Sequence, residues 1–242
     1  MKSYWNVQTF SQPSAQELKR RANASLSSAK KKGQLFEPVL LPERSGRTIC
    51  RSWWGQAWCR NLERYADFAS RIERGKRYVR TGTVVDLKIR GGRVEARVQG
   101  SRKIPYKVGI RISPLSETKC QSIIDKCGRR IESLEKLAAG EFPEELKELF
   151  LEDGLFPSPR EISFDCSCPD WALMCKHVAA AMYGIGVRLD ENPFYFFVLR
   201  GIDIDRFIAL TLENKVEEML KKSDRITERV IEDADLTGLF GL

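Results

Sequence analysis

The 242-residue sequence contains a single histidine, His177, and no apolar run long enough to cross a membrane. A membrane-spanning helix needs about 20 consecutive apolar residues, whereas the most apolar stretch here covers only 194–199. The glycine-rich phosphate-binding loop of P-loop ATPases is also absent, so we do not expect the chain to be an ATPase itself. The first residues lack the apolar segment of a secretory signal. We therefore expect a cytoplasmic protein with no membrane association.

The cysteines do not suit a framework of disulfides. Their number, 7, is odd, and a cytoplasmic compartment would keep them reduced. Metal binding, or burial as free thiols, is therefore the expected use. Burial is the expectation for Cys50, Cys59, Cys120 and Cys127. A second metal site built from these four is an alternative, but their spacing is not that of a zinc knuckle.

Acidic residues are scarce in the first half of the chain. The formal net charge is +8, and residues 1–60 contain 11 Lys or Arg against 3 Asp or Glu. Residues 71–112 contain 13 basic and 3 acidic residues, whereas basic and acidic residues are equal in number over 61–242 as a whole. A one-sided basic distribution is typical of a protein that contacts an anionic partner on one surface.

Hydrophobic periodicity predicts a mixed helix and sheet structure. Apolar residues recur every three or four positions over 52–69, which predicts a helix that begins after Ser52. A basic connector follows at 71–80. Alternating apolar and polar residues then predict a three-stranded antiparallel sheet with one buried face, followed by further helices. The expected strands are 83–90, 93–99 and 106–112, and the expected helical regions are 116–151, 177–185, 193–200 and 203–222.

The predicted fold is α+β, with four parts in chain order. Turn-forming prolines and glycines at 154–160 mark the strongest boundary. The expected parts are a basic, partly flexible N-terminal arm at 1–47, an α+β domain at 48–160, a zinc-binding module at 161–200, and a helical C-terminal segment at 201–242.

Cys166, Cys168, Cys175 and His177 follow the pattern C-x-C-x6-C-x-H and predict one structural zinc ion. Zinc prefers four sulfur or nitrogen ligands in a tetrahedron. Two cysteines two residues apart share a face only where the backbone is extended, so the first pair should lie on extended backbone. The second pair should lie at the start of the next helix. Four protein ligands leave no position for a reactive water, which argues against catalysis.

This pattern, with Pro169-Asp170 inside it and an alanine-rich helix after it, resembles the SWIM zinc finger, a compact ββα module. The similarity is to prokaryotic SWIM zinc finger family proteins and covers roughly residues 48–210. The resemblance implies a partner ATPase of the SWI/SNF type, and it implies binding to DNA or protein. Beyond the finger, the segments that carry the resemblance are 52–58, 80–82, 98–102 and 192–201.

Basic residues on the exposed faces of the predicted strands, and next to them, are the candidate nucleic-acid contacts. Phosphate contacts require little more than Lys and Arg side chains within reach. The alternative is an ordinary solvated sheet face. The candidates are Arg77, Arg80, Lys88, Arg90, Arg93, Arg97, Arg102, Lys103, Lys107 and Arg111.

Trp53, Trp54 and Trp58 have two interpretations. They are either a platform for stacking bases or, at helical spacing, part of the core, which we expect for Trp54 and Trp58. Trp171 is expected to pack over the metal.

The leading hypothesis is a non-catalytic, zinc-binding accessory factor that binds nucleic acid, expected to be DNA, and acts with a SWI/SNF-type ATPase. The alternative is a protein–protein adaptor, whose zinc finger and apolar segment 194–199 dock a partner without touching nucleic acid. With the only histidine expected to bind zinc, the usual general base is missing, and we do not expect an enzyme.

Overall fold

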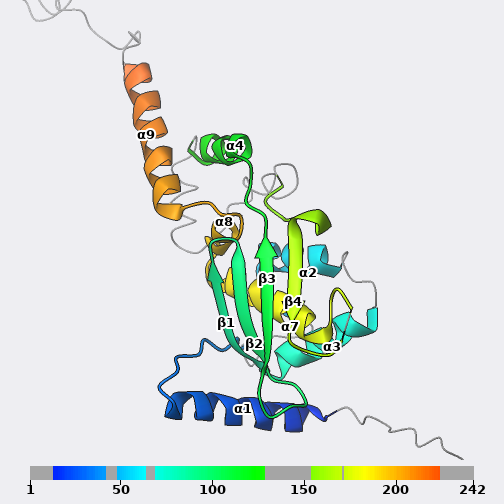
Figure 1. The fold of residues 1–242 in the computed structure, drawn as a ribbon. Helices are drawn as coiled ribbons and strands as arrows, with labels where there is room; N and C mark the ends of the chain where they lie inside the picture. Colours follow the sequence, from blue (N-terminus) through cyan, green and yellow to red (C-terminus); the bar gives the residue numbers. More distant parts are fainter. Residues whose placement is uncertain (1–12, 42–47, 64–68, 129–153, 171, 224–242) are drawn as a thin grey trace, which may run out of the picture.

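The computed structural model describes residues 13–41, 48–63, 69–128, 154–170 and 172–223. Its centre is an antiparallel sheet in the order β1-β2-β3-β4 (Figure 1). The α+β prediction is confirmed, but the predicted three-stranded sheet is wrong, because a fourth strand is present. The strands are β1 (Val84–Arg90), β2 (Arg93–Val98), β3 (Tyr106–Ile112) and β4 (Ile162–Cys166).

The place of the fourth strand in this sheet was not predicted, because its partner strand is distant in sequence. β4 has only five residues, too few for a clear alternation of apolar and polar side chains. It pairs with β3 through Ile112 and Ile162 at one end and through Val108 and Cys166 at the other. The predicted zinc-binding segment therefore begins as an integral strand of the main sheet.

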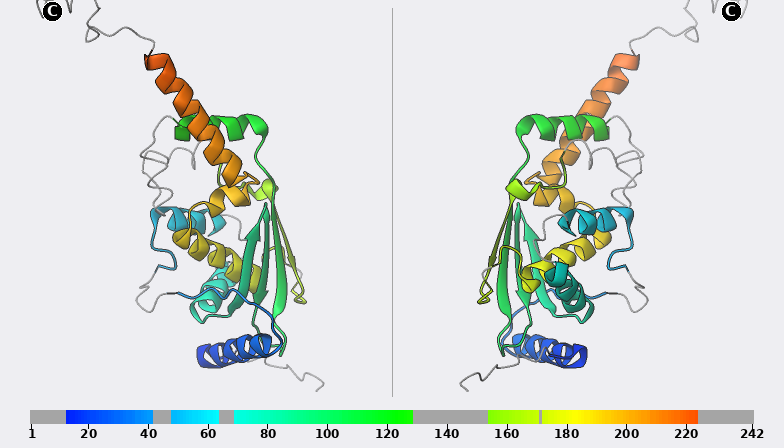
Figure 2. Two further views of the ribbon diagram at one scale, coloured as in Figure 1. Left: turned by 90° about the vertical axis from the view of Figure 1, so that its left-hand side faces the viewer. Right: turned by 90° about the vertical axis from the view of Figure 1, so that its right-hand side faces the viewer.

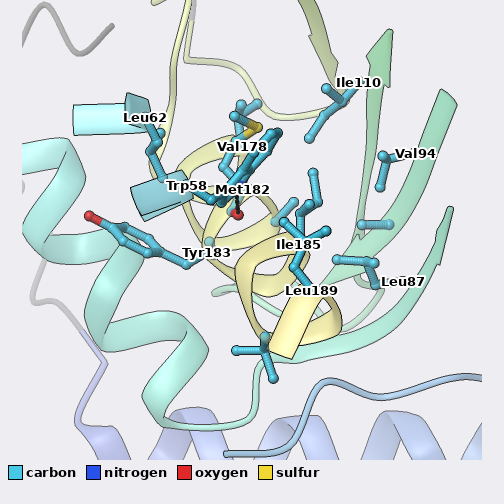
Figure 3. Close-up of a cluster of buried hydrophobic side chains, with 14 of the residues drawn as sticks. Trp58, Leu62, Leu87, Val94, Ile110, Val178, Met182, Tyr183, Ile185 and Leu189 are labelled. Carbon is cyan, nitrogen blue, oxygen red and sulfur yellow. Dashed lines mark hydrogen bonds between the residues drawn. The ribbon is translucent and has the colours of Figure 1, made fainter. Parts of the chain in front are cut away.

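Helix α7 (Lys176–Glu191) lies between the sheet and the helices α2 (Trp53–Glu63) and α3 (Ala69–Arg80) (Figure 2). Twelve of its 16 residues are buried, as expected for a helix that is covered on every side. Figure 3 shows Ile185 and Leu189 on the side of the sheet and Tyr183 on the side of α2 and α3.

The prediction that this helix ends near Gly184 and Gly186 is wrong. Both glycines lie inside α7, where neighbouring groups leave no room for a side chain. A Cβ on Gly184 would lie 2.8 Å from Leu87 Cδ1, and one on Gly186 would lie 2.8 Å from Cys50 Sγ. Glycine costs a helix about 1 kcal/mol relative to alanine, but here it permits close packing.

The predicted basic connector at 71–80 is also wrong, because these residues form α3. Among the residues of this helix whose burial is described, only Ile72, Tyr78 and Val79 are buried apolar side chains, so its apolar stripe is narrow in the sequence. Gly75 allows α3 to approach α7 closely, since a Cβ there would lie 2.5 Å from the Cβ of Ala179.

Helix α2 begins as predicted, with Ser52 Oγ accepting a hydrogen bond from Gly55 N at 3.0 Å. Trp58 is only 2% exposed, and its indole donates to the carbonyl oxygen of Met182 at 2.9 Å. Its placement in the core is confirmed. Trp53 and Trp54 are half-buried and pack against the core, so neither forms a fully exposed stacking platform.

The segment predicted as a basic arm contains helix α1 (Ala15–Lys31), which packs at one end of the sheet (Figure 1). Its Leu18, Ala22 and Ala29 are buried. Ser25 Oγ also donates to Gln99 Oε1 at 2.6 Å. A short apolar face is therefore enough to dock this helix.

The remaining elements lie at the opposite end of the sheet (Figure 1). The predicted helices around 193–200 and 203–222 are confirmed. Helices predicted beyond residue 128 and before 152 lie outside the described residues. None of the described helices is both long and apolar enough to cross a membrane. The elements at this end of the sheet are α4 (Glu117–Gly128), a short 3-10 turn (Pro159–Glu161), α8 (Tyr195–Leu199) and α9 (Ile204–Ser223).

An ion pair between a buried arginine and a partly exposed glutamate joins the C-terminal end of α8 to the start of β4. Arg200 is 1% exposed, and its Nη2 lies 2.5 Å from Glu161 Oε1. Its Nη1 also donates to the carbonyl oxygen of Ser113 at 2.8 Å. Burial raises the pKa of Glu161, but hydrogen bonds from Arg200 and Ser158 outweigh it and lower the pKa from 4.5 to about 2.

We expect Glu161→Gln to lower the free energy of unfolding by about 2 kcal/mol at pH 7, because it leaves Arg200 buried without a countercharge. Since the pKa of Glu161 is lower in the folded state, the contribution is complete above pH 4.5 and is lost as the pH falls toward 2. Chemical denaturation of wild type and variant between pH 7 and 3 measures this. Glu191→Gln, which removes the partner of the more exposed Arg188, is the control and should cost less than about 1 kcal/mol. Equal losses for both variants, or a difference independent of pH, would contradict the assignment.

Candidate metal centre

The four predicted metal ligands meet where β4 leads into α7. Cys166 is the last residue of β4, and Cys168 follows two residues later. Cys175 is the N-cap of α7, and His177 is its second residue. The expected placement of one pair on extended backbone and the other at a helix start is confirmed, and the ligand atoms all lie within 4.8 Å of one another.

The spacing of these atoms fits one tetrahedral metal ion. His177 Nδ1 lies 3.9 Å from Cys166 Sγ and 3.8 Å from Cys175 Sγ. A tetrahedron with metal–sulfur bonds of about 2.3 Å and metal–nitrogen bonds of about 2.0–2.1 Å has sulfur–nitrogen edges of roughly 3.6 Å. The two sulfur–nitrogen distances therefore need to shorten only slightly to match this tetrahedron. The group can hold one metal ion, with His177 binding through Nδ1.

Aromatic rings hold the imidazole of His177 in place. The ring is stacked on Tyr106 with centroids 4.2 Å apart, and Tyr78 meets it edge-on at 5.6 Å. Its Nε2 is buried and has no hydrogen-bond partner within the described part of the chain. A Cβ on Gly100 would lie 2.9 Å from this Nε2 and 2.6 Å from a ring carbon of Tyr106. Gly100 thus provides the space that the imidazole occupies.

Hydrogen bonding and burial shift the pKa values of the ligands in different directions. A hydrogen bond with Cys166 lowers the pKa of Cys175 to about 3, against the effect of burial. The same hydrogen bond, together with burial, raises the pKa of Cys166, and burial raises the pKa of Cys168. Burial also lowers the pKa of His177, which favours the neutral imidazole that binds metals. Because metal binding requires thiolates, it would release protons from Cys166 and Cys168, and the affinity for metal should rise with pH.

The loop between the ligand pairs is fixed by neighbouring elements. Asp170 accepts from Ala172 N at 3.2 Å and forms an ion pair with Arg71 of α3 at 3.2 Å. Ser167 exchanges hydrogen bonds with the backbone of Lys107, at 2.9 and 3.0 Å. The cluster is therefore attached to α3, β3, β4 and α7, so an ion here would join elements of the main core.

Sequence reasoning missed the groups around the ligands. Gly100 and Tyr106 lie about 70 residues before His177 in the sequence, and only the fold brings them together. Arg71, the first residue of the predicted basic connector, is paired with Asp170. Trp171 lies outside the described residues, so its predicted packing over the metal stays a prediction.

The other predicted thiols and cations are distributed over several elements. Cys50 is buried and Cys59 and Cys120 are partly buried, whereas the side chain of Cys127 lies outside the described part. The ten candidate nucleic-acid contacts are exposed or partly exposed. Arg77 and Arg80 lie on α3, Lys88 and Arg90 on β1, Arg93 and Arg97 on β2, Arg102 and Lys103 in the following loop, and Lys107 and Arg111 on β3.

Comparison with known proteins finds a relative of similar sequence whose name states no function. The chain is 36% identical over 164 residues to a Mycobacterium tuberculosis protein named "Uncharacterized protein Rv2102". The match covers 66% of this chain and 59% of that protein, so the chain spans about three fifths of the relative's length. No protein-family model matches the chain, and no solved structure matches it.

Removal of a ligand should release the metal and destabilise the segment around it. We expect Cys175→Ser and His177→Ala to lose the bound ion and to expose backbone amides over 161–200, because metal binding contributes to folding. Elemental analysis and hydrogen exchange measure the two effects. Cys120→Ser is the control and should retain the ion. A full equivalent of metal with an unchanged melting temperature in either ligand variant would show that the ligand assignment is wrong.

Gly100→Ala tests the space beside the imidazole. We expect it to displace the His177 ring and to weaken metal binding by about tenfold, the scale on which groups around a ligand act. Competition with a chromophoric chelator measures the affinity. Gly109→Ala is the matched control, because a Cβ there would lie 3.8 Å from its nearest neighbour, an ordinary contact. Equal affinities for the two variants would contradict the role given to Gly100.

Proposed function

We propose that the chain is a zinc-containing nucleic-acid-binding protein of the SWIM zinc finger type, which acts beside a SWI/SNF-type ATPase. Three sulfur donors and one imidazole are a common ligand set for structural zinc, which supports zinc as the ion. In this proposal residues 161–200 form the SWIM module, with β4 and α7 supplying a strand and the helix. The role of the ion is structural, since the four side chains fill a tetrahedron.

The main support for nucleic-acid binding is a row of three arginines across the outer face of the sheet. Residues paired between neighbouring strands include Arg90 with Arg93, and Arg93 with Arg111. The next residue in the row is Ser163, so no acidic side chain interrupts it. Like charges placed opposite one another destabilise a sheet. Bound phosphates would neutralise this repulsion, so the arrangement favours a phosphate-binding role for the row.

The surroundings of the arginine row also favour an anion. None of its three arginines has an ion-pair partner among the described residues. Next to the row is a hollow of about 500 Å³, which is also lined by Arg160 and by the Gly91-Gly92 turn. Glu161 borders the hollow, but its carboxylate is already paired with the buried Arg200.

A second basic hollow lies at the opposite end of the strands, beside α1. Its volume is about 830 Å³, and Glu17 is the one acidic residue among those that line it. Arg97 and the arginine row are four residues apart along β2, which corresponds to roughly 13 Å. No described helix covers the outer face between them (Figure 2). The cations that line this hollow are Arg20, Arg21, Lys32, Arg97, Arg102 and Lys103.

The positions of the two hollows favour a nucleic-acid backbone that runs along the outer face of the sheet. The middle of the face is less basic, since Lys88 is paired with Glu95 and Gly109 with Asp165 in the strand register. Contacts would therefore concentrate at the two ends. Contacts to phosphate by Lys and Arg carry no sequence information, so the proposed binding is strongly salt-dependent and tolerant of sequence.

The adaptor alternative has lost part of its basis. It invoked the apolar segment 194–199, but Phe196, Phe197 and Leu199 are at most 1% exposed and belong to the core. Exposed apolar side chains occur instead on α9, at Val216 and Leu220 among others. Co-purification with an ATPase without any affinity for nucleic acid would favour the adaptor.

The double variant Arg93→Gln/Arg111→Gln tests the proposal. We expect weaker binding to single- and double-stranded oligonucleotides, and a plot of log affinity against log salt whose slope is smaller by about 1 per lost phosphate contact. Fluorescence anisotropy across salt concentrations measures both. The melting temperature should be unchanged or higher, because a like-charge pair is removed.

The control double variant is Arg206→Gln/Lys221→Gln on α9, which removes the same charge elsewhere. It should leave the slope unchanged. No binding by the wild type at low salt would reject the function, whereas equal slopes for the two double variants would reject only the arginine row.

A further inference from the structure

Two cysteines outside the metal centre face each other at the base of a small cavity. Cys50 precedes α2 and Cys59 lies within it, and their sulfur atoms are 3.4 Å apart. Both sulfurs lie against Gly186 of α7, where a Cβ would be 2.8 Å from Cys50 Sγ and 3.2 Å from Cys59 Sγ. The missing side chain at Gly186 creates the space that the two thiols share.

The two thiols differ in their access to solvent. Cys50 is 1% exposed, whereas Cys59 is partly exposed. Both line a cavity of about 230 Å³, whose wall also carries Arg60, Lys76 and Arg80. The one acidic group in this wall, Glu63, is paired with Lys76 at 3.0 Å. Cys59 is therefore the accessible thiol and Cys50 the sheltered one, and the nearby cations attract anionic reagents to Cys59.

The sheltered thiol, Cys50, is held in its protonated form. The hydrogen bond with Cys59 and burial both raise the pKa of Cys50. Cys50 therefore stays protonated, with its sulfur in contact with that of Cys59. In this arrangement the thiol of Cys59 can attack a disulfide, and the thiol of Cys50 is in place to attack the mixed disulfide that forms.

We propose that Cys50 and Cys59 form a redox modification site, which reacts with small anionic disulfides such as oxidised glutathione and closes to an intramolecular disulfide. The inference is independent of the proposed nucleic-acid function. It rests on the sulfur contact, the shared space over Gly186 and the cationic cavity at Cys59. A disulfide requires the sulfurs to approach to about 2.05 Å, and rotation of the two side chains in this space can supply that movement.

The reaction proceeds in two exchanges that balance. The Cys59 thiolate attacks one sulfur of oxidised glutathione, forming a mixed disulfide and releasing one glutathione thiolate. Cys50 then attacks Cys59 Sγ, forming the Cys50–Cys59 bond and releasing the second glutathione. The protons of the two cysteines pass to the two glutathiones. The pair is oxidised by two electrons, and the reagent is reduced by two.

The experiment uses the full chain with its metal bound. The protein is treated with oxidised glutathione, alkylated, digested without reductant and analysed by mass spectrometry, while the metal content is followed. We expect a Cys50–Cys59 cross-link that reductant reverses, with metal retained. Cys50→Ser should stop at a glutathione adduct on Cys59, because the second thiol is missing. Cys59→Ser should give no cross-link.

Cys120→Ser is the matched control, since it removes a partly buried thiol elsewhere, and it should form the cross-link as the wild type does. Absence of the cross-link in wild type would overturn the proposal, as would an unmodified Cys59 in the Cys50→Ser variant. A cross-link that forms only after the metal is released would also overturn it, because it would reflect unfolding. Circular dichroism of each variant before treatment establishes that it is folded.

Discussion

Helix α7 is covered on every side, and the position of its first turn constrains the rest of the structure. The sheet contacts one side of the helix, and α2 and α3 contact the other. Its N-cap is Cys175 and its second residue is His177, so two of the four grouped ligands belong to this turn. The other two continue from β4. An ion bound here would fix the angle at which the chain leaves the sheet and enters its core helix.

The two faces of the sheet are under different physical demands. The inner face supplies apolar side chains such as Leu87, Val94 and Ile110 to the packing around α7 (Figure 3). The outer face carries like-charged neighbours in register, which a sheet selected only for stability would avoid. The stability contributed by the buried core and by the pairing of β4 with β3 offsets this repulsion. The thiol pair beside Gly186 lies on the far side of α7, so it is separated from both the outer face and the metal ligands.

Several features could be predicted because they depend on residues close together in the sequence. The ligand set has short internal spacings, the strands β1 to β3 show a two-residue alternation, and Ser52 precedes a regular apolar stripe. Features that involve distant segments were missed or misjudged. β4 is too short to show a period, α3 has a narrow apolar face, and Gly184 and Gly186 resemble a helix end until the atoms that crowd them are known.

The amino-acid sequence alone determined the identity of the four candidate ligands, the mixed α and β character, and the concentration of positive charge in the first half of the chain. Only the tertiary structure decided that Gly100 and Tyr106 enclose His177, that Arg71 pairs with Asp170, that three arginines stand in one row, and that Cys50 meets Cys59. The reason is physical. Local patterns report which face of an element is apolar, whereas contacts between distant elements depend on how those faces pack in three dimensions.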